Sequence, residues 1–353
     1  MSTFDFDFEL KLNPPQSAGP IADQVEKILE AFGLYVKVKS VVRGPRVDTL
    51  RTELLGTTSI GRLRRICDDL SARLERPGVK LDTGDDGSPY LQIPRKDPEF
   101  PGLSTLPAPV DPYDIQLGVG MDGRPLTVNL RQAAHILCGG STGSGKSTLL
   151  KTMLQSLLSR HDRSTLRVLI GDPKRVDFPD FKNHPAVLDV VHDRLTMRDW
   201  LRAIYEHMEQ RYCRLAELGL ADAADAPGMP PIWVLIDEFT AFGFRETPWA
   251  QATGTAGPSD SMAGVTNLLE RGRAAGIHLL LATQNPVVTA VPGALKACCP
   301  TRIALRVPQV ANSRVIIDRA GAEALLGRGY AYLSAGELRR FQAAVPDMPV
   351  AHR

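Results

Sequence analysis

A short glycine-rich segment has the residue types and spacing needed to bind phosphate. Gly140 and Gly145 are separated by four residues, and Lys146 and Ser147 follow at once. An apolar run precedes the segment and helix-forming residues follow it, which is the strand–loop–helix context of a P-loop. Glycines let backbone N–H groups face phosphate oxygens, and the positive end of the following helix attracts the same anion. We predict an ATP-binding loop made of Gly140, Ser141, Thr142, Gly143, Ser144, Gly145, Lys146, Ser147 and Thr148.

Hydrolysis needs a second element, because a P-loop alone only binds phosphate. Asp237 and Glu238 directly follow the apolar run 232–236, so two carboxylates are predicted at the end of a buried strand. Asp237 is then placed to hold the shell of a Mg²⁺ ion that Ser147 also ligates, while Lys146 contacts the β- and γ-phosphates. Glu238 is placed to orient and deprotonate the attacking water. The pattern predicts an ATPase that uses Mg²⁺.

Two further residues could complete such a site. Gln284 follows the predicted strand 277–282 and Thr283. Its side-chain amide could sense the γ-phosphate or the attacking water, or could simply face solvent. Arg273 is expected on a helix that enters this strand. A guanidinium there could reach a phosphate bound by a neighbouring subunit, or could be an ordinary exposed helix arginine. From the residues alone, both alternatives stay open.

The elements that must position these residues alternate along the chain. Strands and helices are predicted in turn, at 136–138, 166–171, 232–236, 277–282 and 302–306 for strands and at 146–159 and 197–218 for helices. Such alternation favours an α/β fold with a mostly parallel sheet covered by helices on both faces.

The first hundred residues show a different pattern. A helix is predicted at 21–32, two strands at 35–42 and 49–55, and a second helix at 61–76, whose arginines form a solvated face. Many prolines follow, which disfavour helix and central strand. We therefore predict a small N-terminal α+β domain at 1–94, a linker at 95–112 and a main domain at 113–353.

Composition excludes some classes of protein and leaves others open. Lys+Arg number 42 and Asp+Glu 40, giving a net charge of +2, so no whole-molecule field indicates a nucleic-acid partner. The 353 residues contain no apolar run of 18 or more and no secretory pattern at the start, so a cytoplasmic protein without a membrane segment is expected. The five cysteines lack zinc-site or disulfide spacing, and reduced core cysteines are the simpler interpretation.

At this point the sequence resembles the motor domain of the FtsK/SpoIIIE DNA translocases, from about residue 25 to about residue 335. The motifs that carry the resemblance are HILCGGSTGSGKS at 135–147, GDPK at 171–174, MEQRY at 208–212, LIDEF at 235–239, RAAGIHLLLATQ at 273–284, PTRIA at 300–304 and GAEALLGRG at 321–329, with 41–47 and 76–79 resembling the family's small preceding domain.

The resemblance implies a RecA-like P-loop NTPase core preceded by a small α+β domain. It also implies an ATP-driven motor that forms a homohexameric ring around double-stranded DNA, with ATP between adjacent subunits. Gln284 then looks like the family's sensor glutamine, and Arg273 matches its trans-acting arginine finger.

The sequence departs from the family where basic residues are expected near the pore. Asn285 and Val310 stand at two such positions. The candidates that remain for contacts with the DNA backbone are Lys296, Arg306 and Arg314. The loop 243–264, with Arg245 and Trp249, could also face the pore, and its part at 250–264 is expected to be a mobile surface loop.

Two other functions compete with DNA translocation. The loss of basic residues keeps open a coupling ATPase that engages a protein substrate, although such ATPases usually carry membrane anchors and tandem motor domains. A nucleotide-dependent scaffold is disfavoured, because every catalytic role is filled. Since neither a membrane segment nor a DNA-reading winged-helix domain is expected, a mobile-element, DNA-transfer or defence setting is favoured over chromosome segregation. Partner proteins stay unknown.

Overall fold

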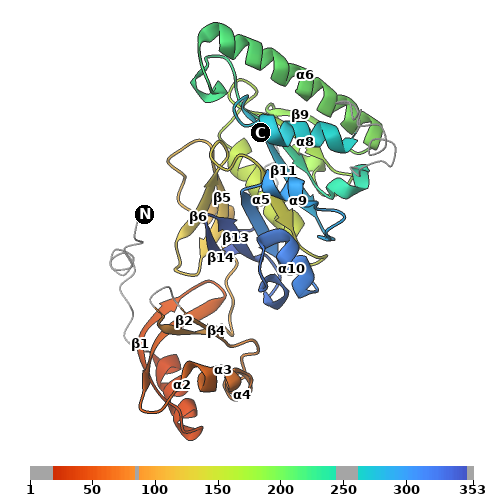
Figure 1. Cartoon of the computed structure of the whole chain (residues 1–353). Helices are drawn as coiled ribbons and strands as arrows, with labels where there is room; N and C mark the ends of the chain where they lie inside the picture. The colour runs from red at the N-terminus through yellow and green to blue at the C-terminus, as the bar shows by residue number, and fades with distance from the viewer. Residues whose placement is uncertain (1–18, 84–86, 244–260, 348–353) are drawn as a thin grey trace. The chain divides into compact units, whose positions relative to one another are not determined.

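The computed structural model describes residues 19–83, 87–243 and 261–347, and side chains in the last range from 265 (Figure 1). The chain divides into two compact units: residues up to Pro101 together with Val119–Arg124, and Gly102–Gly118 together with the residues from Pro125 onward. The chain thus changes from one unit to the other at Gly102, inside the predicted linker. The division at 94 and 113 stays a prediction.

The first unit is a four-stranded antiparallel sheet with helices. Its strands lie in the order β1-β2-β4-β3, and their core side chains include Leu50 and Leu91, both fully buried. Its elements are α2 (Pro20–Ala31), β1 (Tyr35–Arg43), β2 (Val47–Leu55), α3 (Ile60–Arg65), α4 (Cys67–Leu74), β3 (Lys80–Thr83) and β4 (Pro89–Pro94).

The predicted helix at 61–76 is wrong in one respect, because it is two helices. The Ile66 N–H bonds to the carbonyl of Leu63, only three residues earlier, which tightens the last turn of α3 and redirects the chain into α4. Both Leu63 and Leu70 remain buried, so the apolar period that suggested one helix is still satisfied.

The second unit is built on a ten-stranded sheet of order β6-β5-β14-β13-β12-β7-β11-β10-β8-β9. The six strands from β12 to β9 in that order are parallel, while β12, β13 and β14 pair antiparallel. The predicted α/β fold with a mostly parallel sheet is confirmed. The elements are η1 (Leu103–Thr105), β5 (Asp114–Gly120), β6 (Pro125–Asn129), β7 (Ile136–Gly139), α5 (Lys146–Leu158), β8 (Arg167–Gly171), η2 (Pro179–Phe181), β9 (Val187–Val191), α6 (Arg194–Leu218), η3 (Ala223–Asp225), β10 (Ile232–Ile236), η4 (Phe239–Phe242), α8 (Ser261–Arg271), β11 (Ile277–Thr283), α9 (Gly293–Ala297), β12 (Thr301–Leu305), α10 (Val310–Ile317), η5 (Ala322–Ala324), β13 (Tyr330–Ala335) and β14 (Glu337–Ala343).

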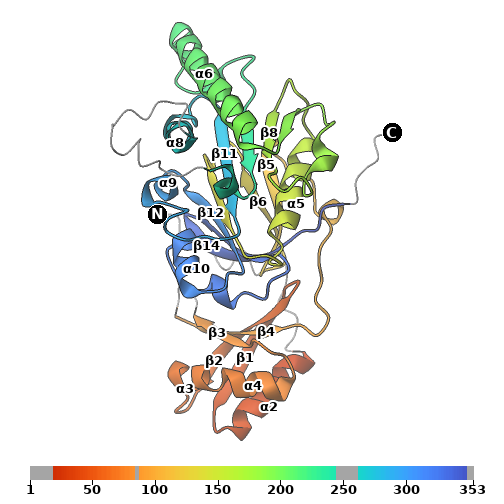
Figure 2. The ribbon, with the colours of Figure 1, turned by 90° about the vertical axis from the view of Figure 1, so that its right-hand side faces the viewer.

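Helices cover both faces of this sheet, with α5 on one side and α8 and α10 on the other (Figure 2). Alternate strand residues point to alternate faces, so Ile136 and Cys138 pack in one cluster with Leu150 and Leu154 of α5. Leu137 between them is also fully buried, and it faces the opposite layer. Within the ranges that the structure describes, no helix is long and apolar enough to cross a membrane.

The parallel arrangement fixes where chemistry can occur. In open α/β sheets the loops after the carboxyl ends of the strands form the ligand-binding edge. Strand β7 lies between β11 and β12, with Gly139 aligned to Thr283 and to Ala304. The loops after β7, β10, β11 and β12 therefore meet at one edge of the sheet, which we call the P-loop edge.

Candidate nucleotide-binding site

The predicted P-loop leaves β7 at the P-loop edge and turns directly into α5, which begins at Lys146. Gly145, the residue before the helix, has φ 99°, a conformation that side chains rarely adopt. A Cβ atom on Gly145 would also lie closer than 3.0 Å to the backbone of Gly329. Glycine is thus needed at position 145 for two reasons: its own backbone conformation and the close approach of Gly329.

Backbone hydrogen bonds tie the loop to three neighbouring strands. Gly140 N–H donates to the carbonyl of Thr283 (3.1 Å), which ends β11. Ser141 donates through its N–H (2.9 Å) and its hydroxyl (3.0 Å) to the carbonyl of Arg306, just after β12. Gly329 N–H donates to the carbonyl of Ser144 (2.7 Å). A loop held at three points is preorganised to present its remaining N–H groups to an anion.

Lys146 and Asp237 form a buried ion pair at the centre of this edge. The Lys146 ammonium group donates to Asp237 Oδ1, and the two side chains are only 3% and 1% exposed. Asp237 Oδ2 is buried too, and has no partner among the described residues. A buried carboxylate oxygen without a partner is costly, so Asp237 has unused capacity for a further cationic or hydrogen-bonding ligand.

The residues present fit a magnesium ion. Ser147 lies in the first turn of α5 and contributes a hydroxyl, and Asp237 contributes the free carboxylate oxygen. Mg²⁺ is usually held by one or two protein oxygens together with water and substrate phosphates, so this small donor set is the expected one. Within the described ranges no group of three or more His, Cys, Asp or Glu side chains could hold a metal by itself.

Glu238 is anchored to the end of β11 by three donors. Its Oε1 accepts from the hydroxyls of Thr240 (2.8 Å) and Thr283 (2.9 Å), and its Oε2 accepts from Gln284 N–H (2.8 Å). Glu238 has φ 50°, in the left-handed region that is unfavourable for a residue with a side chain and that persists only where the surroundings hold it. The Gln284 amide oxygen in turn accepts from the Thr142 hydroxyl of the P-loop (3.0 Å). The structure therefore brings together Lys146, Asp237, Glu238 and Gln284.

Arg273 lies at the opposite edge of the sheet. Its predicted place on a helix is wrong, because α8 ends at Arg271 and Arg273 is in the turn that precedes β11. Gly276, with φ 70°, supplies the left-handed conformation that this turn needs. Since β11 has seven residues at about 3.3 Å each, Arg273 is roughly 20 Å from the P-loop edge of its own chain.

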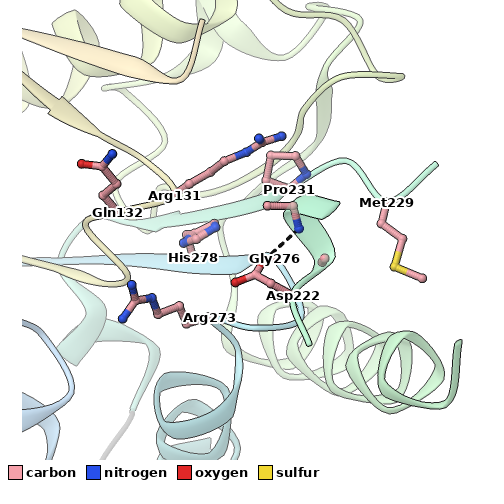
Figure 3. Close-up of a pocket in the computed structure, with 10 residues that line it drawn as sticks. Arg131, Gln132, Asp222, Met229, Pro231, Arg273, Gly276 and His278 are labelled. Carbon is pink, nitrogen blue, oxygen red and sulfur yellow. Dashed lines mark hydrogen bonds between the residues drawn. The ribbon is translucent and has the colours of Figure 1, made fainter. Parts of the chain in front are cut away.

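A small pocket of about 110 Å³, open to solvent, lies beside Arg273 (Figure 3). The Arg131 and Arg273 side chains lie on either side of His278, and Asp222 accepts a hydrogen bond from Ala224 N–H (2.8 Å). Desolvation lowers the pKa of His278 to about 4, so the imidazole is neutral at physiological pH. The guanidinium groups of Arg131 and Arg273 thus outnumber the single carboxylate of Asp222, so the pocket favours an anionic ligand.

Two residues of α6 hold the turn that carries Arg273. The buried Arg211 guanidinium donates to the carbonyls of Ala275 and Pro230, both at 2.7 Å, and the Tyr212 hydroxyl donates to the carbonyl of Arg271. Sequence reasoning assigned these residues no role, although they stand together in the MEQRY motif. It also assigned no role to Thr283 or Thr240, whose hydroxyls bind Glu238.

The three predicted DNA contacts come from three different segments of the second unit. Lys296 on α9 is paired with Asp318, which also binds Arg302 at the start of β12. Arg306 is exposed at the P-loop edge, where its carbonyl binds the loop. Arg314 is exposed on α10. Arg245 and Trp249, and the loop segment 244–260 around them, lie outside the described residues.

Cysteines take no part in the chemistry of this edge. Burial raises the pKa of Cys138, on β7, to about 12, and that of Cys299 to about 12 as well. Both thiols therefore stay protonated and unreactive. All five cysteines are free, as predicted. Cys67, Cys138 and Cys299 are core residues, but Cys298, whose pKa is also raised by desolvation, is only partly buried and Cys213 is exposed.

Comparison with known proteins shows what this chain is similar to. Residues 108–230 match the FtsK/SpoIIIE family model. DNA translocase FtsK of Haemophilus influenzae is 32% identical over 89% of the chain, and the chain spans 65% of that protein. The chain thus covers less than two thirds of this relative's length.

Two solved structures show the same fold. The pCW3 conjugation coupling protein TcpA, in its monomer form with ATPγS, has a TM-score of 0.64 at 20% identity and covers 92% of this chain and 94% of its own. The cytoplasmic domain of the Thermomonospora curvata type VII secretion ATPase EccC has a TM-score of 0.58 at 27% identity, over 72% of this chain and 33% of its own. The chain thus carries a segment that matches the FtsK/SpoIIIE family model, is similar to a DNA translocase FtsK over most of its sequence, and shares its fold with these two structures.

Proposed function

We propose that this protein is an ATPase that moves double-stranded DNA in the cytoplasm, working as a homohexameric ring. One observation carries the proposal: Lys146, Asp237, Glu238 and Gln284 converge at one edge of the sheet, while Arg273 is held at the other. Such a subunit has most of a hydrolytic site at one edge and the missing cation at the other.

At the P-loop edge, Lys146 must exchange its partner to act on ATP. It now neutralises Asp237, and in the proposed reaction it contacts the β- and γ-phosphates. Glu238 is the proposed base that takes a proton from the attacking water, and Gln284 orients that water or the γ-phosphate. The backbone N–H groups of the P-loop stabilise the charge that develops on the phosphates.

Ser147 and Asp237 would hold Mg²⁺. When bound, this ion would neutralise phosphate charge. The unpartnered Oδ2 atom of Asp237 is the observation that supports the assignment. When Lys146 leaves Oδ1 to contact ATP, the second oxygen of the Asp237 carboxylate also becomes free. This movement would therefore favour binding of ATP and Mg²⁺ together.

Arg273 is the proposed trans-acting residue. It cannot reach the P-loop of its own chain across roughly 20 Å, and an exposed guanidinium at that edge can reach a phosphate only in a neighbouring subunit. Head-to-tail contacts between such edges close into a ring when the rotation allows it. A ring of six subunits is the arrangement that the resemblance to the FtsK/SpoIIIE translocases favours.

The proposed DNA contacts remain Lys296, Arg306 and Arg314, which would bind backbone phosphates without sequence preference. The similarity to a protein named DNA translocase over 89% of the chain supports DNA as the substrate. A mobile-element, DNA-transfer or defence setting is proposed with it, and the likeness in fold to a conjugation coupling protein agrees with the second of these.

A coupling ATPase that engages a protein substrate is the second candidate. The fold likeness to a type VII secretion ATPase favours it, as does the lack of basic residues at Asn285 and Val310. Both candidates use the same hydrolytic site, so only the substrate separates them.

The test is ATP hydrolysis by the purified protein with and without long linear double-stranded DNA. Glu238→Gln serves as the control for contaminating activity. We expect DNA to raise the rate severalfold and the variant to be inactive, and a DNA-bound roadblock to be displaced in a second assay. Hydrolysis that requires Glu238 but ignores DNA at low and moderate salt would reject DNA as the substrate and favour the protein-coupling function.

A further inference from the structure

The pocket beside Arg273 has positive charge on two sides. The side chains of Arg131 and Arg273 line it on either side of His278 (Figure 3). Neither arginine forms an ion pair with any residue that the structure describes. Asp222 is the only carboxylate among the described residues of the lining, and its Oδ1 atom already accepts from Ala224 N–H (2.8 Å). Both guanidinium groups are therefore available to an anion.

A third cation is buried behind the wall of the pocket. Gly276 forms part of this wall, and a Cβ atom placed on it would lie 3.1 Å from Arg211 Nη1. Arg211 is 3% exposed and binds only backbone carbonyls within the described ranges, where its Nε atom has no partner. Desolvation lowers its pKa only to about 10, so it stays charged at neutral pH. A buried charge without a counter-charge is costly, so an anion in the pocket would stabilise this wall.

Arg131 is held in position before any ligand binds. Its guanidinium lies over the Tyr113 ring, 3.8 Å from the ring centroid. The Tyr113 hydroxyl donates to the Thr165 carbonyl (3.0 Å), and the ring stacks on His161 with centroids 4.7 Å apart. The N–H groups of a guanidinium lie in its plane, so an arginine over an aromatic face keeps them for hydrogen bonds to an anion.

The size of the pocket fits a single phosphate group. Its volume is about 110 Å³. One water molecule needs about 10–15 Å³, whereas pockets for whole small molecules take roughly 300–1,000 Å³. A phosphate group with a few waters therefore fits, and a whole nucleotide does not. Since a terminal phosphate carries about two negative charges near neutral pH, two guanidinium groups match its charge.

We propose that this pocket binds a phosphate group and that Arg131 acts in it together with Arg273. The terminal phosphate of ATP on the P-loop edge of a neighbouring subunit is the group that enters. Arg131 then makes a second trans-acting contact, and Arg211 is a positioning residue that adds charge from behind Gly276. This assignment rests on the proposed function, because it takes Arg273 as the trans-acting residue, and it adds the site in which that residue works.

The first test detects the pocket with inorganic phosphate. His278 lines the pocket, so its ring signals in histidine-labelled NMR spectra report a bound anion. We expect phosphate to shift these signals in the wild type at neutral pH, against chloride at equal ionic strength. Arg131→Gln and Arg273→Gln should each weaken this binding roughly tenfold or more, the effect of one hydrogen bond between charged groups.

Arg163→Gln is the matched control for this titration. Arg163 is exposed in the turn before β8, and the parallel register of β8, β10 and β11 places this turn at the same edge of the sheet as the pocket. Arg163 is not part of the pocket lining, so its variant should keep the wild-type affinity for phosphate. All variants are checked for thermal stability, and Arg131→Lys takes the place of Arg131→Gln if the glutamine variant does not fold.

The second test identifies whose phosphate enters the pocket. ATP hydrolysis is measured for Arg131→Gln alone, where we expect a rate at least tenfold below the wild type, and in equal mixtures with two other variants. Mixed with Glu238→Gln, it should recover to roughly a quarter of the wild-type rate, because a quarter of the interfaces combine two intact edges. Mixed with Arg273→Ala, it should not recover, because both changes lie on the same edge.

The outcomes separate the pocket from its proposed role. An anion-binding pocket is rejected if phosphate leaves the His278 signals of the wild type unchanged, or if Arg131→Gln binds phosphate as tightly as Arg163→Gln does. Phosphate binding that depends on Arg131, together with wild-type hydrolysis in Arg131→Gln, overturns the neighbour's ATP as the source and makes this a site for free phosphate. A wild type that binds phosphate through Arg131 but does not hydrolyse ATP supports the pocket and refutes the proposed function.

Discussion

At the scale of single residues, the buried pair of Lys146 and Asp237 makes the P-loop lysine a structural residue as well as a proposed catalytic one. Lys146→Met leaves a buried carboxylate without a counter-charge. We expect the free energy of unfolding, measured by urea titration without nucleotide, to fall by about 3–5 kcal/mol.

The double variant Lys146→Met with Asp237→Asn tests the cause. It removes the orphaned charge and should recover most of the lost stability, while hydrolysis stays abolished. Equal urea midpoints for the single and double variants would show that the ion pair is not what the lysine contributes to folding.

Gly145 and Gly143 separate two reasons for using glycine in the loop. Both have positive φ, at 99° and 77°, so alanine is strained at either position by roughly 1–2 kcal/mol. Only at Gly145 would the added Cβ meet the backbone of Gly329, while nothing lies within 4 Å at Gly143. We expect Gly145→Ala to abolish ATPγS binding in calorimetry and Gly143→Ala to weaken it only moderately. Equal losses would mean that strain alone matters.

The sequence predicts a site residue where a local pattern identifies it, and does not where its role depends on a long-range contact. The identities of Lys146 and Asp237 follow from spacing, because glycines and carboxylates next to apolar runs are local patterns. The role of Thr283 does not, since it depends on β10 and β11 being neighbours, which brings residues 45 positions apart into hydrogen-bond contact. Arg211 is hidden for the same reason, with its acceptor Ala275 64 positions away.

At the scale of elements, α6 positions the turn before β11 through Arg211. Arg211→Lys keeps a charge but loses the planar fork that serves the carbonyls of Ala275 and Pro230. We expect hydrolysis per subunit to fall at least tenfold, as for Arg273→Ala, while ATPγS affinity stays within a factor of about two because the P-loop edge is untouched. Arg214→Lys, on the same helix and paired with Glu217 at the surface, is the control. Unchanged hydrolysis in Arg211→Lys would show that catalysis does not depend on how Arg211 holds the turn before β11.

The amino ends of β7 and β11 carry two buried histidines that make stability depend on pH. Desolvation lowers the pKa of His135 to about 3 and that of His278 to about 4, against an ordinary value of 6.5. Between pH 6.5 and about 4 the unfolded chain binds protons that the folded chain does not, so stability is lost as the pH falls. Each histidine contributes a slope of up to about 1.4 kcal/mol per pH unit.

Urea unfolding between pH 7 and 4.5 measures this slope. His278→Asn keeps a polar side chain that can face the Ala134 carbonyl, which His278 contacts at 3.0 Å, and removes the titrating group. In this variant the slope of unfolding free energy against pH should fall by the amount that one proton contributes, about 1.4 kcal/mol per pH unit. The same slope in variant and wild type would place the titration elsewhere.

The elements themselves were predictable where burial is complete. Central parallel strands are apolar on both faces, so β8, β10 and β11 read as continuous apolar runs, and β10 matches its predicted bounds. The hairpin of β13 and β14 was missed because β14 begins with alternating exposed and half-buried residues, including Arg339. Its pairing with the rest of the sheet is a long-range property that no local pattern records.

At the scale of the whole molecule, a site divided between two edges predicts complementation. Glu238→Gln subunits lack the base but keep Arg273, and Arg273→Ala subunits lack the finger but keep the base. Each variant alone should be inactive. In an equal mixture about a quarter of the head-to-tail interfaces combine the two intact halves, so hydrolysis should return to roughly that fraction of the wild-type rate. A mixture as inactive as its parts would place Arg273 outside the neighbour's site.

The position of β7 in the sheet also sets the order in which the protein can fold during synthesis. Both of its neighbours come much later in the chain, since β7 ends at Gly139 whereas β11 begins at Ile277 and β12 at Thr301. At cellular rates of synthesis, on the order of ten seconds pass between the synthesis of β7 and that of the strands that pair with it. Until then β7, all of whose residues are buried in the folded protein, has two unpaired edges, so the ribosome-bound chain is exposed to aggregation during that interval.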